Sequence, residues 1–121
     1  MWKNTKSKYN SRKIEADGET FDSRKEYFRY KELQLLEKAG KIENLRRQVK
    51  YRLLPSQYEE ADNLMKRVLI ERPVTYVADF VYRVPGEKHD TVEDCKGLKT
   101  DVYILKRKLM LYFHGIKIKE T

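Results

Sequence analysis

Three charged side chains interrupt two stretches of the sequence that otherwise look like buried strands. Residues 74–97 contain two apolar, β-branched and aromatic runs joined by a turn-rich connector at 85–90, which is typical of a β-hairpin. Asp79 interrupts the first run, and Asp94 and Lys96 lie two apart in the second, so strand alternation places the latter two on one face. Buried carboxylates and ammonium groups are costly unless they are paired or bind a metal. We therefore expect a functional site on this hairpin.

Simpler interpretations of these residues stay open. Asp79 and Lys96 are equally suited to a buried structural salt bridge. A register slip of one residue would turn Glu93 inward and leave Asp94 as a solvated acid near the turn. Gln48, on a strand expected earlier in the chain, either reaches the site or faces solvent.

A helix expected over residues 24–39 brings a further acid. Ser23 is a good N-cap, Glu26 three residues later completes a capping box, and Gly40 suits the position after the helix. At helical spacing Glu26 shares one stripe with three apolar residues, namely Tyr30, Leu33 and Leu36. We expect Glu26 either to cap the helix only, or also to bind or support a metal.

Composition limits the class of protein and of metal. The 121 residues suit one domain, and a net charge of +8 favours a polyanionic partner. The absence of a long apolar run or a signal-peptide pattern predicts a soluble, cytoplasmic protein without a membrane partner. The single cysteine, Cys95, excludes an intrachain disulfide and a cysteine-built zinc site. With only two histidines, any metal would be held by oxygen, which indicates Mg²⁺ or Mn²⁺.

Basic residues outside the hairpin are candidates for contact with nucleic acid. Residues 1–13 hold five Lys or Arg and no acid, so they form either a frayed terminus or a basic arm that follows a phosphate backbone. Arg12 and Lys13 would then contact DNA. Lys99, Lys106 and Lys108 either form a solvated surface or contact phosphates next to the site.

The remaining pattern predicts a single α+β domain over residues 14–121, in the order helix, three strands, helix, strand. We expect a strand at 42–54, a short helix at 57–67, a strand at 68–71, a helix at 101–113 capped by Thr100, and an edge strand at 116–119. The stripe expected to face the core from the last helix consists of Val102, Leu105, Leu109 and Tyr112. A second stripe on the first helix covers either more core or a homodimer surface, and it consists of Phe28, Leu35 and Ala39.

The hairpin acids resemble the signature of the PD-(D/E)xK nuclease superfamily, an Asp ending one strand and an acid-x-Lys in its partner. Asp79 and Asp94-Cys95-Lys96 match that signature, with Ala78 where the superfamily has proline. Other segments resemble a phage-encoded branch called domain of unknown function 1064, and these are Phe21–Glu26, Leu36–Ile42, Tyr76–Phe80, and Lys96–Thr100 followed by Tyr103.

The resemblance implies a restriction-endonuclease-like core and a phage-type, Mg²⁺-dependent DNA endonuclease that would work in the host cytoplasm. Asp79 and Asp94 would hold the metal, the resemblance adds the backbone carbonyl of Cys95, and Glu26 is a further candidate ligand. Lys96 would orient the attacking water and stabilise charge on the phosphorus. The products would carry 5′-phosphate and 3′-hydroxyl ends. Two alternatives remain, a structure-specific resolvase for four-way or flapped DNA and a non-catalytic DNA-binding module of phage replication or packaging.

Overall fold

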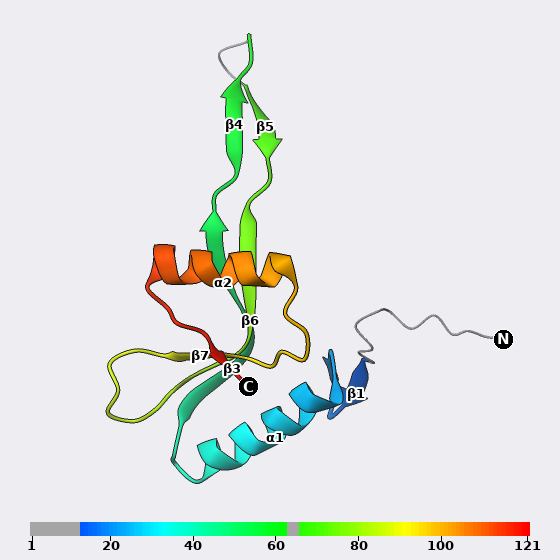
Figure 1. Cartoon of the computed structure of the whole chain (residues 1–121), viewed down its shortest axis with the longest axis vertical. Helices are drawn as coiled ribbons and strands as arrows, with labels where there is room; N and C mark the ends of the chain where they lie inside the picture. The colour runs from blue at the N-terminus through cyan, green and yellow to red at the C-terminus, as the bar shows by residue number, and fades with distance from the viewer. Residues whose placement is uncertain (1–12, 63–65) are drawn as a thin grey trace, which may run out of the picture.

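A long antiparallel pair of strands runs through the centre of the computed structural model, which describes residues 13–62 and 66–121 (Figure 1). The pair consists of β3 (Glu43–Leu54) and β6 (Val74–Arg83). β7 (Thr91–Asp94) pairs antiparallel with β6, and β8 (Lys119–Glu120) pairs parallel with β7, giving the order β3-β6-β7-β8. The predicted hairpin and the single small α+β domain are therefore confirmed.

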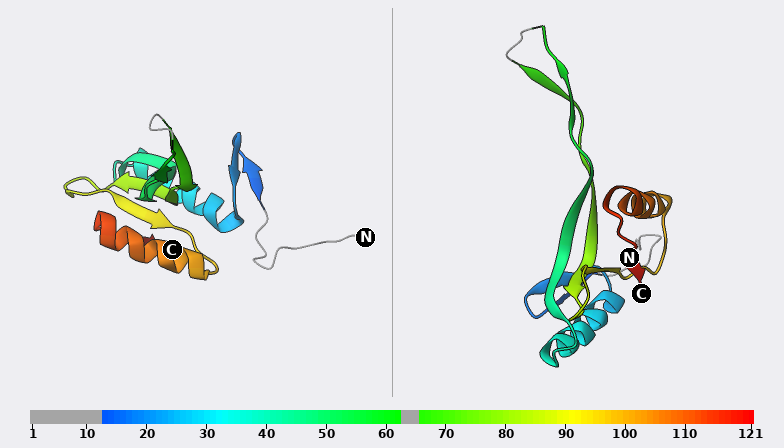
Figure 2. Two further views of the ribbon diagram at one scale, coloured as in Figure 1. Left: turned by 90° about the horizontal axis from the view of Figure 1, so that it is seen from above. Right: turned by 90° about the vertical axis from the view of Figure 1, so that its left-hand side faces the viewer.

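The two helices pack on opposite faces of this sheet (Figure 2). α1 (Arg24–Lys38) covers an apolar cluster whose buried members are Leu33, Ile42, Phe80 and Tyr82. α2 (Asp101–His114) covers a larger cluster on the other face, with buried members Leu53, Tyr76, Ala78, Val81, Val92, Tyr103, Met110 and Ile118. We call these the α1-side and α2-side clusters. β6 contributes to both, so this strand is the centre of the core.

Local sequence signals account for the ends of the helices. The Ser23 hydroxyl accepts a hydrogen bond from the Glu26 N–H at 3.1 Å, as the capping box predicts, and the Thr100 hydroxyl caps α2 in the same way. Gly40 and Gly115 follow the helices with φ of 77° and 66°, the left-handed conformation that glycine adopts readily.

A short hairpin precedes α1. β1 (Ile14–Ala16) and β2 (Glu19–Phe21) pair across Asp17 and Gly18, which both have positive φ, as a two-residue hairpin turn requires. The Phe21 ring lies against the Tyr30 ring at 5.5 Å, so this hairpin is attached to α1 near its start. Residues 1–12, including Arg12 and most of the predicted basic arm, lie outside the described residues.

The helix predicted for residues 57–67 is wrong. β4 (Gln57–Glu60) and β5 (Arg67–Glu71) form an antiparallel hairpin that extends the central ribbon away from the body of the domain (Figure 1). β3 and β6 already bring the two ends of this segment together, which favours continued pairing, whereas a helix here would nucleate without a surface to pack against. The strand predicted at 68–71 is confirmed, and the final edge strand is shorter than predicted.

The core-facing stripe predicted for α2 is also wrong. The exposed fractions of Val102, Leu105 and Tyr112 are 63%, 57% and 81%, and Leu109 is only half-buried. Tyr103 and Met110 are buried instead, and the hydrogen bond from the Tyr103 hydroxyl to Glu120 of β8 holds this side of the helix against the sheet. The second stripe of α1 does not cover core either, since Phe28 and Leu35 are 59% and 68% exposed.

In the part of the chain that the structure describes, neither helix has the length and apolar character needed to cross a lipid bilayer.

The orientation of α2 can be tested by a matched pair of truncations on that helix. Met110→Ala should lower the free energy of unfolding by about 2–4 kcal/mol, because it leaves a cavity in the α2-side cluster. Leu105→Ala removes a side chain of similar size from solvent and should change it by less than about 0.5 kcal/mol. Urea unfolding monitored by circular dichroism gives both values, and equal losses would contradict the orientation.

Candidate functional site

Asp79 and Asp94 lie on neighbouring strands, and backbone pairing brings them together. Asp79 Oδ2 accepts a hydrogen bond from the Cys95 N–H at 2.8 Å, which ties the acid of β6 to the residue that follows β7. Asp94 is 1% exposed, and one of its oxygens, Oδ2, accepts a hydrogen bond from the Tyr76 hydroxyl. Both acids are therefore held in defined positions on the hairpin.

The other oxygen of Asp94 is not satisfied. The Lys96 Nζ lies 3.3 Å from Asp94 Oδ1, but without hydrogen-bond geometry, so this buried oxygen has no hydrogen-bond partner among the described residues. Strand alternation predicted that these two side chains share a face, and their contact confirms it. Lys96 also lies over the Tyr103 ring, 4.6 Å from its centroid, so α2 fixes the position of the ammonium group.

Gln48 approaches Asp79 from β3 through an unusual backbone conformation. Its φ is 53°, in the left-handed region that is uncommon for residues other than glycine. Gln48 lies opposite Asp79, between the pairs Arg47–Phe80 and Val49–Ala78. Backbone conformations of this kind cost on the order of 1 kcal/mol or more and tend to occur at functional sites.

Both central strands change faces at this point. On β6, Ala78 belongs to the α2-side cluster and Phe80 to the α1-side cluster, although residues two apart in a regular strand share a face. On β3, Val49 packs against the α2-side cluster and Leu45 against the α1-side cluster. Asp79 therefore lies where the sheet turns from one helix to the other, which leaves room for a polar residue in a strand that is otherwise buried.

Glu26 reaches the same region from the first turn of α1. It is 1% exposed, and its Oε1 accepts a hydrogen bond from the Asp22 N–H at 2.7 Å, so the carboxylate does help to cap the helix. Its Oε2 accepts from Gln48 Nε2 at 3.0 Å, and the same nitrogen lies 3.5 Å from Asp79 Oδ1. Gln48 thus links Glu26 to Asp79, and Glu26 has a role in this network beyond that of a cap.

The surroundings of Asp79 raise the pKa of its carboxyl group. Burial, then the carboxylate of Asp94, then that of Glu26 raise the pKa of Asp79 from 3.8 to about 8, against the lowering effect of the Cys95 N–H. Burial and the hydrogen bond to Asp94 likewise raise the pKa of Tyr76 above its usual range. Burial and the neighbouring carboxylates therefore disfavour the ionised form of Asp79 in the metal-free protein.

The neighbouring acid Glu93 is also buried but fully paired. Arg29 donates two hydrogen bonds to it, at 2.6 and 2.9 Å, and the Tyr82 hydroxyl donates a third at 2.7 Å. Burial opposes ionisation of Glu93, but these bonds outweigh it and lower the pKa of its carboxyl. Both acids of β7, Glu93 and Asp94, are therefore buried, and they lie on opposite faces of the sheet. The buried structural ion pair of this region is Arg29–Glu93, not Asp79–Lys96.

A model of the family described as protein of unknown function (DUF1064) matches residues 6–120. The chain belongs to this family. No curated protein and no solved structure matches the chain.

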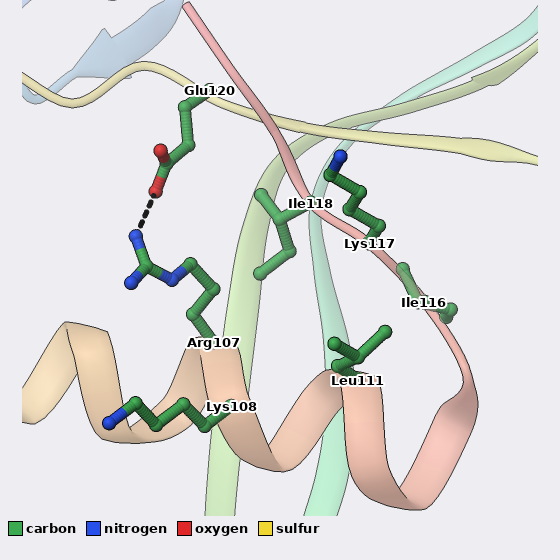
Figure 3. A pocket seen from close by; sticks show the side chains of 7 residues that line it. All are labelled: Arg107, Lys108, Leu111, Ile116, Lys117, Ile118 and Glu120. Atoms are coloured by element: carbon green, nitrogen blue, oxygen red, sulfur yellow. Dashed lines mark hydrogen bonds and ion pairs between the residues drawn. The ribbon is translucent and has the colours of Figure 1, made fainter.

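The predicted DNA-contacting lysines of this DUF1064 member lie in different surroundings. Lys99 forms an ion pair with Glu120 at 3.1 Å, and the half-buried Lys106 has no ion pair recorded within residues 13–62 and 66–121. Lys13 lies 3.8 Å from Asp22, with both side chains largely exposed. Lys108 lines a pocket of about 360 Å³ beside β8 (Figure 3), whose other lining residues are Arg107, Leu111, Ile116, Lys117, Ile118 and Glu120.

This pocket adjoins the acids through Tyr103. The Tyr103 hydroxyl donates to Glu120 at 2.7 Å, and the face of its ring carries Lys96. Arg107 also pairs with Glu120, at 3.1 Å (Figure 3). Two cationic residues outside the candidates from sequence, Arg107 and Lys117, therefore line this pocket.

The pKa of Asp79 makes a prediction for the metal-free protein. Between 3.8 and about 8 the folded state retains a proton that the unfolded state has lost, so the free energy of unfolding should fall as pH rises through this window. Asp79→Asn removes the titrating group and should flatten this part of the curve. The measurement is urea unfolding in EDTA at several pH values, and parallel curves for the two proteins would contradict the assignment.

Proposed function

We propose that this chain is a divalent-metal-dependent DNA endonuclease of the PD-(D/E)xK superfamily. The observation that carries the proposal is the buried Asp94 Oδ1, which has no hydrogen-bond partner among the described residues and lies 3.3 Å from the Lys96 ammonium group. Asp79 stands on the neighbouring strand and interacts electrostatically with Asp94. A four-stranded sheet with a helix on each face also supports the restriction-endonuclease-like core that the resemblance implies.

The residues present fit Mg²⁺ or Mn²⁺. Mg²⁺ usually takes one or two protein carboxylates and completes its shell with water and substrate phosphate. Within residues 13–62 and 66–121 no three side chains of His, Cys, Asp or Glu are grouped as a closed metal site. An open site held by Asp79, Asp94 and the Cys95 carbonyl agrees with both facts, and a cation there would favour the ionised form of Asp79.

Glu26 would support this site indirectly and would not bind the metal itself. Its two oxygens already accept hydrogen bonds from the Asp22 N–H and from Gln48, and Gln48 stands between Glu26 and Asp79. Glu26 would therefore orient Gln48 and, through it, Asp79. Groups that orient metal ligands in this way typically contribute about 10- to 100-fold to metal affinity or activity.

The protein's own groups then have defined tasks in phosphodiester hydrolysis. When bound, the divalent cation would offset phosphate charge and make a water molecule more acidic. Lys96 would donate hydrogen bonds to the attacking water and to a phosphate oxygen. Tyr76 would hold Asp94 in place by its hydroxyl, and the Tyr103 ring would restrict the movement of Lys96.

Charge supports DNA as the substrate. The net charge of +8 attracts a polyanion, and Arg107, Lys108 and Lys117 gather at the pocket that adjoins the acids through Tyr103. A non-catalytic DNA-binding module explains the acids less well, because uncompensated carboxylates beside a phosphate-binding surface weaken binding.

The proposal predicts cleavage that depends on metal and on both hairpin acids. We expect nicking or cutting of at least one of single-stranded, duplex, flap and four-way DNA in Mg²⁺ or Mn²⁺, and none in EDTA. Asp79→Asn and Asp94→Asn should each lower the rate by about two orders of magnitude or more, because each removes a charged metal ligand. Asp90→Asn, which changes a half-exposed acid of the hairpin connector, is the matched control and should cleave like the parent.

Metal-dependent cleavage that survives in Asp79→Asn or Asp94→Asn would show that the site is elsewhere. Absence of cleavage on all four substrates, together with tight DNA binding, would favour the non-catalytic module.

A second prediction separates catalysis from binding among the lysines. Lys96→Ala should lower turnover at saturating DNA by about two orders of magnitude. Lys108→Ala should instead weaken affinity and reduce the salt dependence of binding by about one counterion. Single-turnover kinetics and binding titrations at several salt concentrations distinguish the two effects, and a pure affinity defect in Lys96→Ala would refute its catalytic role.

A further inference from the structure

The β4–β5 hairpin exposes apolar residues on both of its faces. All residues of β4 and β5 are exposed, although β5 has three successive aliphatic residues, Val68, Leu69 and Ile70, with exposed fractions of 47–48%. Tyr58 on β4 is 47% exposed. The hairpin extends beyond both helices (Figures 1 and 2). A two-stranded hairpin without a packing partner is only marginally stable in water, so this one is expected to acquire a partner.

The charge of this segment indicates a protein partner. Residues 55–73 carry four acids and three Lys or Arg, in a chain whose net charge is +8. The acids of this segment therefore slightly outnumber its basic residues, and it has no excess positive charge with which to hold nucleic acid. Its aliphatic residues suit another polypeptide.

The two edges of the hairpin differ. β4 has Glu59 and Glu60 together, and natural edge strands use charges of this kind to resist pairing. β5 has no charged residue in its centre, and the register irregularity of the hairpin falls on this strand, where Ile70 is the extra residue between the pairs Gln57–Glu71 and Tyr58–Leu69. Its apolar, partly β-branched run suits the addition of a further strand.

The sequence of β5 is complementary to itself in antiparallel orientation. About a two-fold axis at Leu69, Arg67 would lie opposite the partner's Glu71, and Val68 opposite the partner's Ile70. Each such pairing occurs twice. Antiparallel pairing of β4 with β4 of a second copy would instead place Glu59 and Glu60 of both copies, four carboxylates in all, in one interface.

We propose that the chain forms a homodimer by antiparallel pairing of β5 with β5 of a second copy, centred on Leu69. The result is a four-stranded sheet in the order β4-β5-β5-β4, in which the aliphatic residues of the two copies lie side by side. Lys66 and Arg72 lie beyond β5, and Pro73 lacks the N–H needed to continue the ladder. The dimer rests on β5 alone and is independent of the proposed nuclease activity.

Analytical ultracentrifugation of the full chain and of three variants tests this interface. The 14.6 kDa parent should sediment as a species of twice that mass. Glu71→Arg should raise the dissociation constant at least about tenfold, because it replaces two ion pairs by two like-charge contacts. In its own hairpin Glu71 lies opposite the uncharged Gln57, so the hairpin itself should persist.

The matched control and the rescue make the register testable. Glu59→Arg makes the same charge change on β4 and should leave the dimer unchanged. The double variant R67E/E71R is made in an E60Q background, because Glu60 lies opposite Arg67 in the hairpin. It exchanges the two charges, restores opposite signs across the two-fold axis, and should return the dissociation constant to within about threefold of the parent value.

A monomeric parent would overturn the proposal, whether the edge of β5 is then free, covered by residues 1–12 or bound by a different protein. A dimer that Glu71→Arg does not weaken would overturn it as well, since another surface, such as the exposed stripe of α2, would then form the contact. Failure of the double variant to recover would exclude this register.

Discussion

Two adjacent carboxylates on a short central strand set the main constraint on this structure. Glu93 and Asp94 of β7 are both almost completely buried and point to opposite faces of the sheet. A buried carboxylate costs several kcal/mol unless other groups compensate for its lost hydration. The fold compensates for this cost in two different ways, one for each carboxylate.

On the α1 side the carboxylate is fully hydrogen-bonded. Arg29 and Tyr82 together donate three hydrogen bonds to Glu93, which joins α1 to the sheet. On the α2 side the carboxylate is only partly hydrogen-bonded. Tyr76 donates to one oxygen of Asp94, while the other oxygen has only the nearby charge of Lys96. The complete arrangement is structural. The partial one is what an open metal site requires, because spare ligand capacity can be used by a cation and its substrate.

The parts of the fold that follow from local chemistry could be predicted from sequence. Ser23 and Thr100 cap the two helices, Gly40 and Gly115 follow them, and the hairpin of residues 74–97 forms where turn residues separate two apolar runs. The parts that depend on tertiary context could not be predicted. Residues 57–67 had a plausible capping signal but became part of a hairpin because β3 and β6 hold their ends together. The rotation of α2 buried Tyr103 and Met110 rather than the more regular aliphatic stripe.

The same division applies to the candidate site. Spacing alone placed Asp94 and Lys96 on one face, and the capping box placed Glu26 at the start of α1, where the structure also has it. The pairing of Glu93 had a signal that was missed, since Arg29 lies three residues after Glu26 on the same helix face. The left-handed conformation of Gln48 had no signal in the sequence, because it accompanies a change of face in both central strands that arises only in the folded sheet.

The proposed site requires that Asp94, unlike the paired acids Glu93 and Asp90, retains capacity for a divalent cation. Mn²⁺ binding followed by electron paramagnetic resonance, in the absence of DNA, tests it directly with the parent, Asp94→Asn and Asp90→Asn. The account predicts that the parent and Asp90→Asn bind Mn²⁺ with equal affinity, and that Asp94→Asn binds at least about tenfold more weakly. Equal Mn²⁺ affinity in all three proteins would contradict it.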